Sequence, residues 1–295
     1  MENKRRLSEG LRKVLRHPLV RLVIEFAFLL AVILGIDMLA QPIVGDSPVD
    51  SVWLAGSLIA SVIVLLAYVG IVRVIERRPV TELAIKRAVP ELSMGLLLGA
   101  SLFVITIGIL ALLGNYRVTG TNPWISVLPA LVAAISAGVI EELWFRGIVF
   151  RNLEEWLNTW WALAISALIF GIVHMANPGA TLWAGLAVAI EAGILLAAAY
   201  IYTRRLWLGI GMHIAWNFVQ GGIFGVAVSG TEYGGLLSGT LSGPALVSGG
   251  EFGVEASIIT VVLSLLVSAA LLYRGHAAGS FKTRSKAQVD PFGGQ

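Results

Sequence analysis

The chain is a series of long apolar runs separated by short polar segments. A helix needs about 20 apolar residues to cross the hydrocarbon core of a bilayer, and about eight runs come near that length. They cover residues 22–40, 52–72, 92–114, 124–145, 160–176, 182–202, 206–227 and 256–273. No alternation with the period of a strand competes with them. The pattern therefore predicts an all-α, polytopic membrane bundle of about eight transmembrane helices.

Composition supports lipid as the solvent for much of the chain. Of 295 residues, 57% are hydrophobic and 13% are charged, and the mean hydropathy is +0.84. One water-soluble core of this length cannot hide so much apolar surface. The sequence has no cysteine, which excludes disulfides, thiolate nucleophiles and Cys-ligated zinc. The net charge of +3 is too small to indicate a nucleic-acid partner.

The positions of Lys and Arg predict the orientation. If the runs are spans, all of the 21 Lys and Arg residues except Arg117 fall on one side. Cytoplasmic loops carry an excess of these residues, so we expect a multi-pass protein of the cell membrane with both termini in the cytoplasm. This assignment puts Arg146 and Arg151 in the polar region after the fourth span.

The predicted spans divide the chain into six segments. In order they are a basic cytoplasmic N-terminal segment (1–21), three N-terminal transmembrane helices (22–114), a core of four transmembrane helices (124–227), a Gly- and Ser-rich external loop (228–255), the last transmembrane helix (256–273) and a cytoplasmic tail (274–295). The external loop lacks Lys and Arg, and we expect it to fold back along the membrane surface.

Ionisable side chains inside a span are costly, so each is a candidate functional residue. Glu141 and Glu142 lie in the cytoplasmic half of the fourth predicted span. Adjacent helical residues point about 100° apart, so these carboxylates face different partners. Arg146 follows Glu142 by four residues, on the same face. We expect Glu142 to pair with Arg146 and Glu141 to face a cavity. The alternative is a structural pair beside a carboxylate that reaches the headgroups.

Two histidines and an asparagine lie in other spans. His174 ends the fifth span, and His213 and Asn217, four residues apart, share one face of the seventh. A single histidine in a span is more often a packing residue than a catalyst, but a carboxylate, two imidazoles and an amide together form a hydrolytic set. Glu191 is mid-span, and it either lines the same cavity or bonds to the backbone. Glu25, near an end of the first span, is expected to reach the membrane surface.

Three motifs in this region resemble those of a known family. They are Glu141-Glu142-x-x-x-Arg146, Phe170-x-x-x-His174, which a common form of the motif extends to Asn177, and His213-x-x-x-Asn217. In this order, on three predicted spans, they are similar to the motifs of the CAAX protease and bacteriocin-processing family, which includes the type II CAAX prenyl endopeptidases. The resemblance covers roughly residues 125–220.

The resemblance implies an integral-membrane endopeptidase with a conical cavity open to the cytosol and residues 124–227 as its catalytic core. Glu141 and His174 would hold and deprotonate a water. His213 and Asn217 would stabilise the oxyanion, and the predicted Glu–Arg pair would support the site. The partners would be membrane lipid and a membrane-associated or lipidated protein or peptide substrate, either a prenylated CAAX protein or a bacteriocin-like peptide.

Zinc is the alternative cofactor. Glu141, His174 and His213 would hold the ion with water as the fourth ligand, but the helical His-Glu-x-x-His pattern is absent from the sequence. We therefore expect no cofactor and a glutamate mechanism. One geometric difficulty applies to both versions. Straight helices rising about 1.5 Å per residue put the three side chains on the order of 10 Å apart in depth, which helix tilt would have to reduce.

Two other classes of function fit the same composition. One is a non-catalytic membrane scaffold or bacteriocin-immunity-type protein of the same fold. The other is a proton-coupled transporter that uses Glu141, Glu191 and the histidines as a relay. Many transporters show inverted repeats and interrupted helix pairs, which this sequence does not display. The complete set of three motifs favours the peptidase.

Overall fold

A computed structural model describes residues 14–15, 17–44 and 51–283, so most of the basic segment 1–21 and the end of the tail lie outside the described residues. The helices are α2 (Pro18–Val44), α3 (Ser51–Ile71), α4 (Ala88–Leu112), α5 (Leu128–Glu142), α6 (Arg151–Trp156), α7 (Thr159–His174), α8 (Leu182–Val188), α9 (Leu195–Thr203), α10 (Trp207–Asn217), α11 (Ala245–Ser248) and α12 (Ile258–Ala277). The strands are β1 (Tyr116–Thr121) and β2 (Leu237–Leu241). Wider π-helical turns cover Val72–Glu76, Leu143–Phe150, Ala189–Ile194 and Phe218–Ile223, and short 3-10 turns cover Thr81–Leu83, Ile85–Arg87, Trp124–Val127 and Val254–Ala256.

These helices confirm an all-α, polytopic integral membrane protein. Within the described residues, six continuous stretches are long and apolar enough to cross a bilayer, namely Pro18–Ala40, Trp53–Glu76, Thr81–Leu112, Trp124–Trp156, Leu182–Thr203 and Ile258–Ala277. The predicted fifth and seventh spans are helical but shorter. The α7 helix has 16 residues, and α10 has 11 before a π-helical segment of 6. The number of eight spans therefore stays a prediction.

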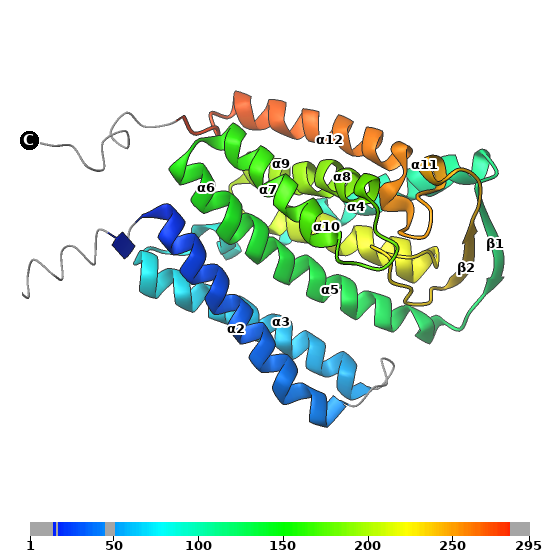
Figure 1. Cartoon of the computed structure of the whole chain (residues 1–295), viewed down its shortest axis with the longest axis horizontal. Helices are drawn as coiled ribbons and strands as arrows, with labels where there is room; N and C mark the ends of the chain where they lie inside the picture. The colour runs from blue at the N-terminus through cyan, green and yellow to red at the C-terminus, as the bar shows by residue number, and fades with distance from the viewer. Residues whose placement is uncertain (1–13, 16, 45–50, 284–295) are drawn as a thin grey trace, which may run out of the picture.

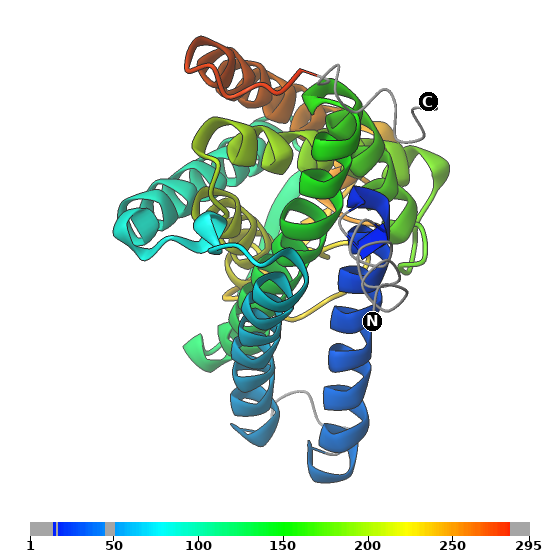
Figure 2. The same cartoon turned by 90° about the vertical axis from the view of Figure 1, so that its left-hand side faces the viewer.

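The α10 helix lies inside the bundle, where it packs against α4, α5 and α9 (Figure 1). Trp216 of α10 is buried edge-on against Phe103 of α4, with ring centroids 5.3 Å apart. On one flank, α2 and α3 form a hairpin, and α3 packs against α5 (Figure 2). The α2 helix begins and α12 ends at the same end of the bundle, and the two strands lie at the opposite end (Figure 1). Any functional residue on α10 is thus enclosed by other helices.

A small antiparallel sheet closes the strand end of the bundle. Strand β1 pairs with β2, with Tyr116 opposite Leu241 and an irregularity between Val118 and Gly120. The sequence analysis did not predict these strands, because they are short, Gly-containing segments paired across about 120 residues of chain, which leaves no local periodicity. The loop 228–255 therefore contains ordered structure, β2 and α11 included, that packs on the helices.

A buried ionic cluster links α2, the π-helical turn that follows α3, and α6, at the end of the bundle where α2 begins. Arg151 donates to Oε2 of Glu76 at 2.6 Å, and its Nη2 lies 3.4 Å from Oε2 of Glu25. Glu25 is fully buried, so the expectation that it reaches the membrane surface is wrong. The charge of Arg151 compensates for the hydration that the buried carboxyl group loses. Arg146 and Arg151 are likewise buried within the continuous helix Trp124–Trp156, not in a polar region after a span.

Small residues allow α4 and α10 to approach each other closely. A methyl group at Gly99 of α4 would overlap the backbone oxygen of Met212, and one at Gly211 of α10 would overlap that of Leu92. Small residues at a helix interface in a membrane let the backbones pack directly, because apolar burial supplies little driving force there. This contact fixes the depth of α10, and with it the depth of His213.

We predict opposite effects for alanine at two glycines of α4. Gly99→Ala should lower the free energy of unfolding by about 1–3 kcal/mol, because the added methyl group overpacks the interface with α10. Gly108→Ala is the matched control, since nothing lies within 4 Å of the added methyl group. It should be neutral or stabilise by up to about 1 kcal/mol through helix propensity. Thermal unfolding in detergent measures both, and equal shifts would contradict the packing argument.

Candidate active site

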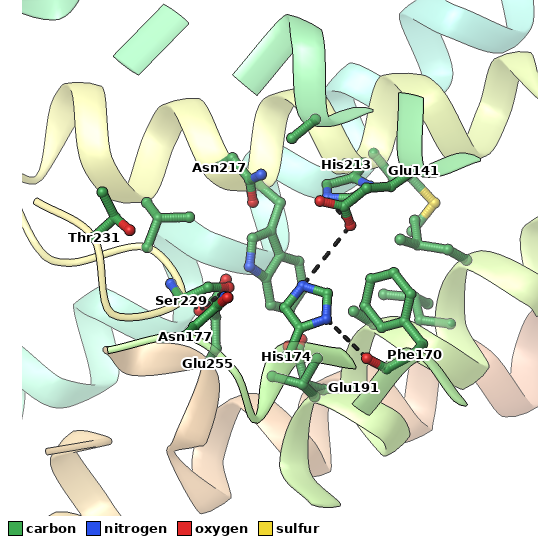
Figure 3. A pocket seen from close by; sticks show the side chains of 18 of the residues that line it. Glu141, Phe170, His174, Asn177, Glu191, His213, Asn217, Ser229, Thr231 and Glu255 are labelled. Carbon is green, nitrogen blue, oxygen red and sulfur yellow. Dashed lines mark hydrogen bonds and ion pairs between the residues drawn. The ribbon is translucent and has the colours of Figure 1, made fainter. Parts of the chain in front are cut away.

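Three helices bring the predicted site residues to one place (Figure 3). Oε2 of Glu141, near the end of α5, lies 3.8 Å from Nε2 of His174, the last residue of α7. The same oxygen lies 3.9 Å from Nε2 of His213 on α10. Asn217, one turn after His213, lines the same cavity. The structure thus brings together all four residues to which catalysis was assigned.

The convergence removes the depth difficulty noted from the sequence. The helix that carries Glu141 continues to Trp156, eleven residues beyond the predicted end of that span, so Glu141 lies near the middle of a 33-residue helical stretch. His174 lies at the far end of α7, which begins at Thr159 just after that stretch. Glu141 and His174 are therefore at similar distances from the turn that joins their two antiparallel helices.

The backbone fixes the tautomer of His174. Its Nδ1 lies 2.8 Å from the carbonyl oxygen of Phe170, one turn earlier on α7. A carbonyl oxygen only accepts hydrogen bonds, so Nδ1 carries the proton and the neutral ring presents the lone pair of Nε2 to Glu141. The Phe170 ring packs against the imidazole with centroids 4.4 Å apart. The second motif therefore holds His174 in one orientation.

A carboxylate orients His213 in the same way. Nδ1 of His213 lies 3.3 Å from Oε1 of Glu142, and this leaves Nε2 facing Glu141. Gly209, one turn earlier on α10, leaves the room that Glu142 needs, because a methyl group there would lie 2.8 Å from Oε2 of Glu142. The two adjacent glutamates thus share His213, each at a different ring nitrogen, while Glu141 also faces His174.

A buried ion pair links the helices of the site. Arg146 Nη1 donates to Oε1 of Glu142 at 2.7 Å, so the pair expected from the spacing is formed, and the two residues are 2% and 0% exposed. Nη2 of Arg146 donates to the carbonyl oxygens of Ala192 and Gly193 at 2.9 and 3.1 Å. The guanidinium carbon also lies 4.8 Å from the ring centroid of Phe170. One guanidinium therefore contacts α5, α7 and the segment between α8 and α9.

Wide π-helical turns accompany three of the helical stretches that form the site. One begins directly after Glu142, one contains Glu191, and one begins directly after Asn217. Such turns occur frequently at functional sites, because the extra residue shifts the face on which later side chains lie. Here they let the same helices present polar residues to the site and apolar residues to their other neighbours.

The cavity has a volume of about 250 Å³ and contains two further carboxyl groups. Glu191 lies on the helical stretch Leu182–Thr203, and Glu255 comes from the segment just before α12 (Figure 3). Oε2 of Glu255 accepts hydrogen bonds from the backbone N–H and the hydroxyl of Ser229, at 2.6 and 3.0 Å. Burial raises the pKa of Glu255 to about 7, although these hydrogen bonds lower it.

Of these residues, Glu191 was a candidate from its position in a predicted span, whereas Glu255 and Ser229 were not predicted. Both belong to the segment 228–255, which was expected to lie along the membrane surface. They line the cavity instead, together with Thr231 and Tyr233. A buried acid in a Gly-rich segment has no periodic signal, so only the folded loop reveals it.

The three candidate zinc ligands, Glu141, His174 and His213, are spaced slightly more widely than the ligands of a tetrahedral zinc ion. In the part of the chain that the structure describes, no group of three or more His, Asp and Glu side chains is arranged to hold one. The imidazole nitrogens lie 3.8 and 3.9 Å from the Glu141 oxygen. Ligands about 2.0–2.2 Å from one tetrahedral zinc ion would lie closer to each other than this.

The fold and the cavity define an integral membrane protein that carries a carboxylate, two imidazoles and an amide around one cavity inside its helix bundle. Residues 122–219 match the family described as "Type II CAAX prenyl endopeptidase Rce1-like". Over 90 residues the chain is 34% identical to the "Putative membrane peptidase YdiL" of Bacillus subtilis (strain 168). The resemblance to the CAAX protease and bacteriocin-processing family is thereby confirmed for this region.

The matched region is limited in extent. It covers 30% of this chain and 34% of the Bacillus protein, so the chain matches about a third of that relative's length. No solved structure matches the chain. The region that matches the family model nevertheless contains all three motifs, because Glu141, His174 and Asn217 fall within residues 122–219.

We predict that the buried ion pair is essential for stability. Arg146→Met should lower the free energy of unfolding by about 3–5 kcal/mol, because it leaves the Glu142 carboxylate buried without a counter-charge. Arg274→Met, at an exposed residue near the end of α12, should change it by less than about 0.5 kcal/mol. Chemical or thermal unfolding in detergent compares them. A similar, small effect of both substitutions would show that the pair is dispensable.

Proposed function

We propose that this chain is an intramembrane endopeptidase that hydrolyses a peptide bond with a water activated by Glu141 and His174. One observation carries the proposal. Nε2 of His174 and Nε2 of His213 both face a single oxygen of Glu141, within the wall of one cavity. Among the described residues that oxygen has no hydrogen-bond partner. A carboxylate with an available lone pair between two imidazoles suits general-base catalysis.

In the proposed reaction, Glu141 takes one proton from water as the water oxygen attacks the carbonyl carbon of the peptide. His174 Nε2 accepts a hydrogen bond from the remaining O–H of the water, which keeps that hydrogen, and so fixes the direction of attack. The carbon–nitrogen bond then breaks, and the proton held by Glu141 passes to the amine that leaves. The low dielectric constant of the surrounding helix bundle strengthens these interactions, because little water competes for the charged groups.

His213 and Asn217 stabilise the oxyanion in this mechanism. With both ring nitrogens protonated, His213 donates Nδ1–H to Glu142 and Nε2–H to the oxyanion, and the Asn217 amide is a second donor. Each such donor is commonly worth about 3–4 kcal/mol. Glu142 acts indirectly, by orienting His213 while its own charge is compensated by Arg146.

The proposed setting follows from the membrane fold. We propose a multi-pass protein of the cell membrane with both termini in the cytoplasm, supported by the Lys and Arg distribution and by α2 and α12 sharing one end of the bundle. Membrane lipid surrounds the helices, and the substrate is a membrane-associated or lipidated protein or peptide. The similarity to the prenyl endopeptidase family supports this class of substrate.

Removing the base tests the function. Glu141→Gln should reduce kcat/KM by about 100-fold or more, because a positioned general base contributes about 10²–10⁴-fold to rate, while the protein stays folded. The assay uses the full chain in detergent, a peptide library, and cleavage mapped by mass spectrometry. Glu232→Gln, at an exposed acid outside the cavity, is the control and should cleave normally. Undiminished cleavage by Glu141→Gln would remove Glu141 as the base, whereas no cleavage by the unsubstituted protein would favour a scaffold or transporter.

A chelator tests the metal-free mechanism separately. Dialysis against chelator should leave kcat/KM within about twofold of the untreated enzyme, because the proposed water activation uses only side chains. Activity that is lost on this treatment and restored by zinc would instead assign Glu141, His174 and His213 to a metal site.

A further inference from the structure

The cavity has an acidic wall that the proposed hydrolysis does not use. Glu191 and Glu255 line the same cavity as Glu141, and they come from a helical stretch and a loop segment that the three motifs do not include. Figure 3 shows Glu191 and Glu255 near His174, with Glu255 beside Ser229, while Glu141 lies across the His174 ring from them. This second pair of carboxyl groups therefore has a role still to be explained.

Glu191 is the sharper case, because its carboxyl group has no compensation. The side chain is 1% exposed, and among the described residues its Oε2 has no hydrogen-bond partner. A buried polar atom without a partner costs about 1–3 kcal/mol, so each such atom in a native structure requires an explanation, and a bound partner is one. Glu255 differs, because Ser229 already satisfies one of its oxygens. Glu191 thus presents an open acceptor to the cavity.

The charge balance of the cavity specifies the missing partner. Its wall carries three carboxyl groups, those of Glu141, Glu191 and Glu255, and two imidazoles, and no Lys or Arg is among the described residues that line it. Arg146 lies behind Phe170 and directs its nitrogens to Glu142 and to backbone carbonyls. A cation that entered the cavity would meet three carboxyl groups and no Lys or Arg side chain among the described lining residues, while the protonated His213 lies between Glu141 and Glu142.

We infer that Glu191 and Glu255 form a subsite that binds a cationic side chain, lysine or arginine, of the peptide being cleaved. This inference rests on the proposed function. The ammonium or guanidinium group donates to the open Oε2 of Glu191 and is attracted by Glu255. The contact satisfies the unpartnered oxygen and compensates its charge, which a neutral side chain cannot do. Glu191 and Glu255 are thus specificity residues, and Glu141 remains the base.

Paired peptides test the subsite. Each peptide has blocked ends and occurs in two forms, one with lysine and one with norleucine, which keeps the length of the chain and removes the charge. The replaced position is moved along the peptide on both sides of the cleaved bond. The full-length protein in detergent should cleave the lysine form with a kcat/KM at least about tenfold higher at one position. A peptide with a free N-terminus and no lysine distinguishes a terminal ammonium from a side chain.

Three variants locate the preference. Glu191→Gln keeps the shape of the side chain and removes its charge, so it should fold, and it should bring the lysine-to-norleucine ratio close to one. Glu255→Gln should reduce the ratio as well. Glu251→Gln, at an exposed acid four residues before Glu255 in the same loop, should leave the ratio unchanged. Glu251→Gln should also cleave the norleucine peptide at the rate of the unsubstituted protein, because Glu251 is not among the residues that line the cavity.

The outcomes separate the inference from the proposed function. Cleavage without a preference for lysine at any position, or a preference that survives in Glu191→Gln, overturns the cationic subsite and leaves the peptidase intact. If no peptide is cleaved, the peptidase proposal fails. The subsite is then tested by measuring how tightly the peptides bind. Fluorescence anisotropy with labelled lysine and norleucine peptides on Glu141→Gln protein should show tighter binding of the lysine form. That difference should vanish when Glu191→Gln is added, and equal binding from the start overturns the subsite.

Discussion

The buried pair of Glu142 and Arg146 is the interaction on which the site depends. Glu142 orients His213 on α10. Arg146 contacts the ring of Phe170, and the carbonyl oxygen of Phe170 orients His174 on α7. Arg146 also donates hydrogen bonds to two backbone carbonyl oxygens between α8 and α9, just after Glu191. Charge that is buried among membrane helices is costly unless it is paired, so this pair holds four helical segments in one arrangement.

Close backbone packing and wide helical turns complement that pair. Glycines let α4 and α10 meet without intervening side chains, which sets the depth of the enclosed helix. The π-helical segments after Glu142 and Asn217 then redirect the following residues into apolar contacts. Rigid positioning is what a catalytic set requires, because small displacements of a reacting group reduce the rate strongly. The open oxygens of Glu141 and Glu191 face the cavity between these fixed elements.

The last polar contribution comes from outside the motif-bearing helices. The segment between β2 and α12 returns to the bundle and places Glu255 in the cavity, fastened by Ser229. The same region pairs with β1 through strands about 120 residues apart in the chain. The cavity therefore combines polar residues of the motif-bearing helices with a carboxyl group from a loop. In the functions proposed above, the helices supply the reacting groups and the loop contributes to the choice of substrate.

The sequence by itself determined the membrane class, the helical bundle and the candidate residues. Long apolar runs leave only helices as a solution in lipid, and spacings of four place Glu142 with Arg146 and His213 with Asn217 on shared faces. Tertiary structure decided the rest. The pairing of β1 with β2, the burial of Glu25 with Arg151, and the entry of Glu255 into the cavity depend on contacts between segments far apart in the chain. Local periodicity carries no information about such contacts, because they arise only when the helices pack.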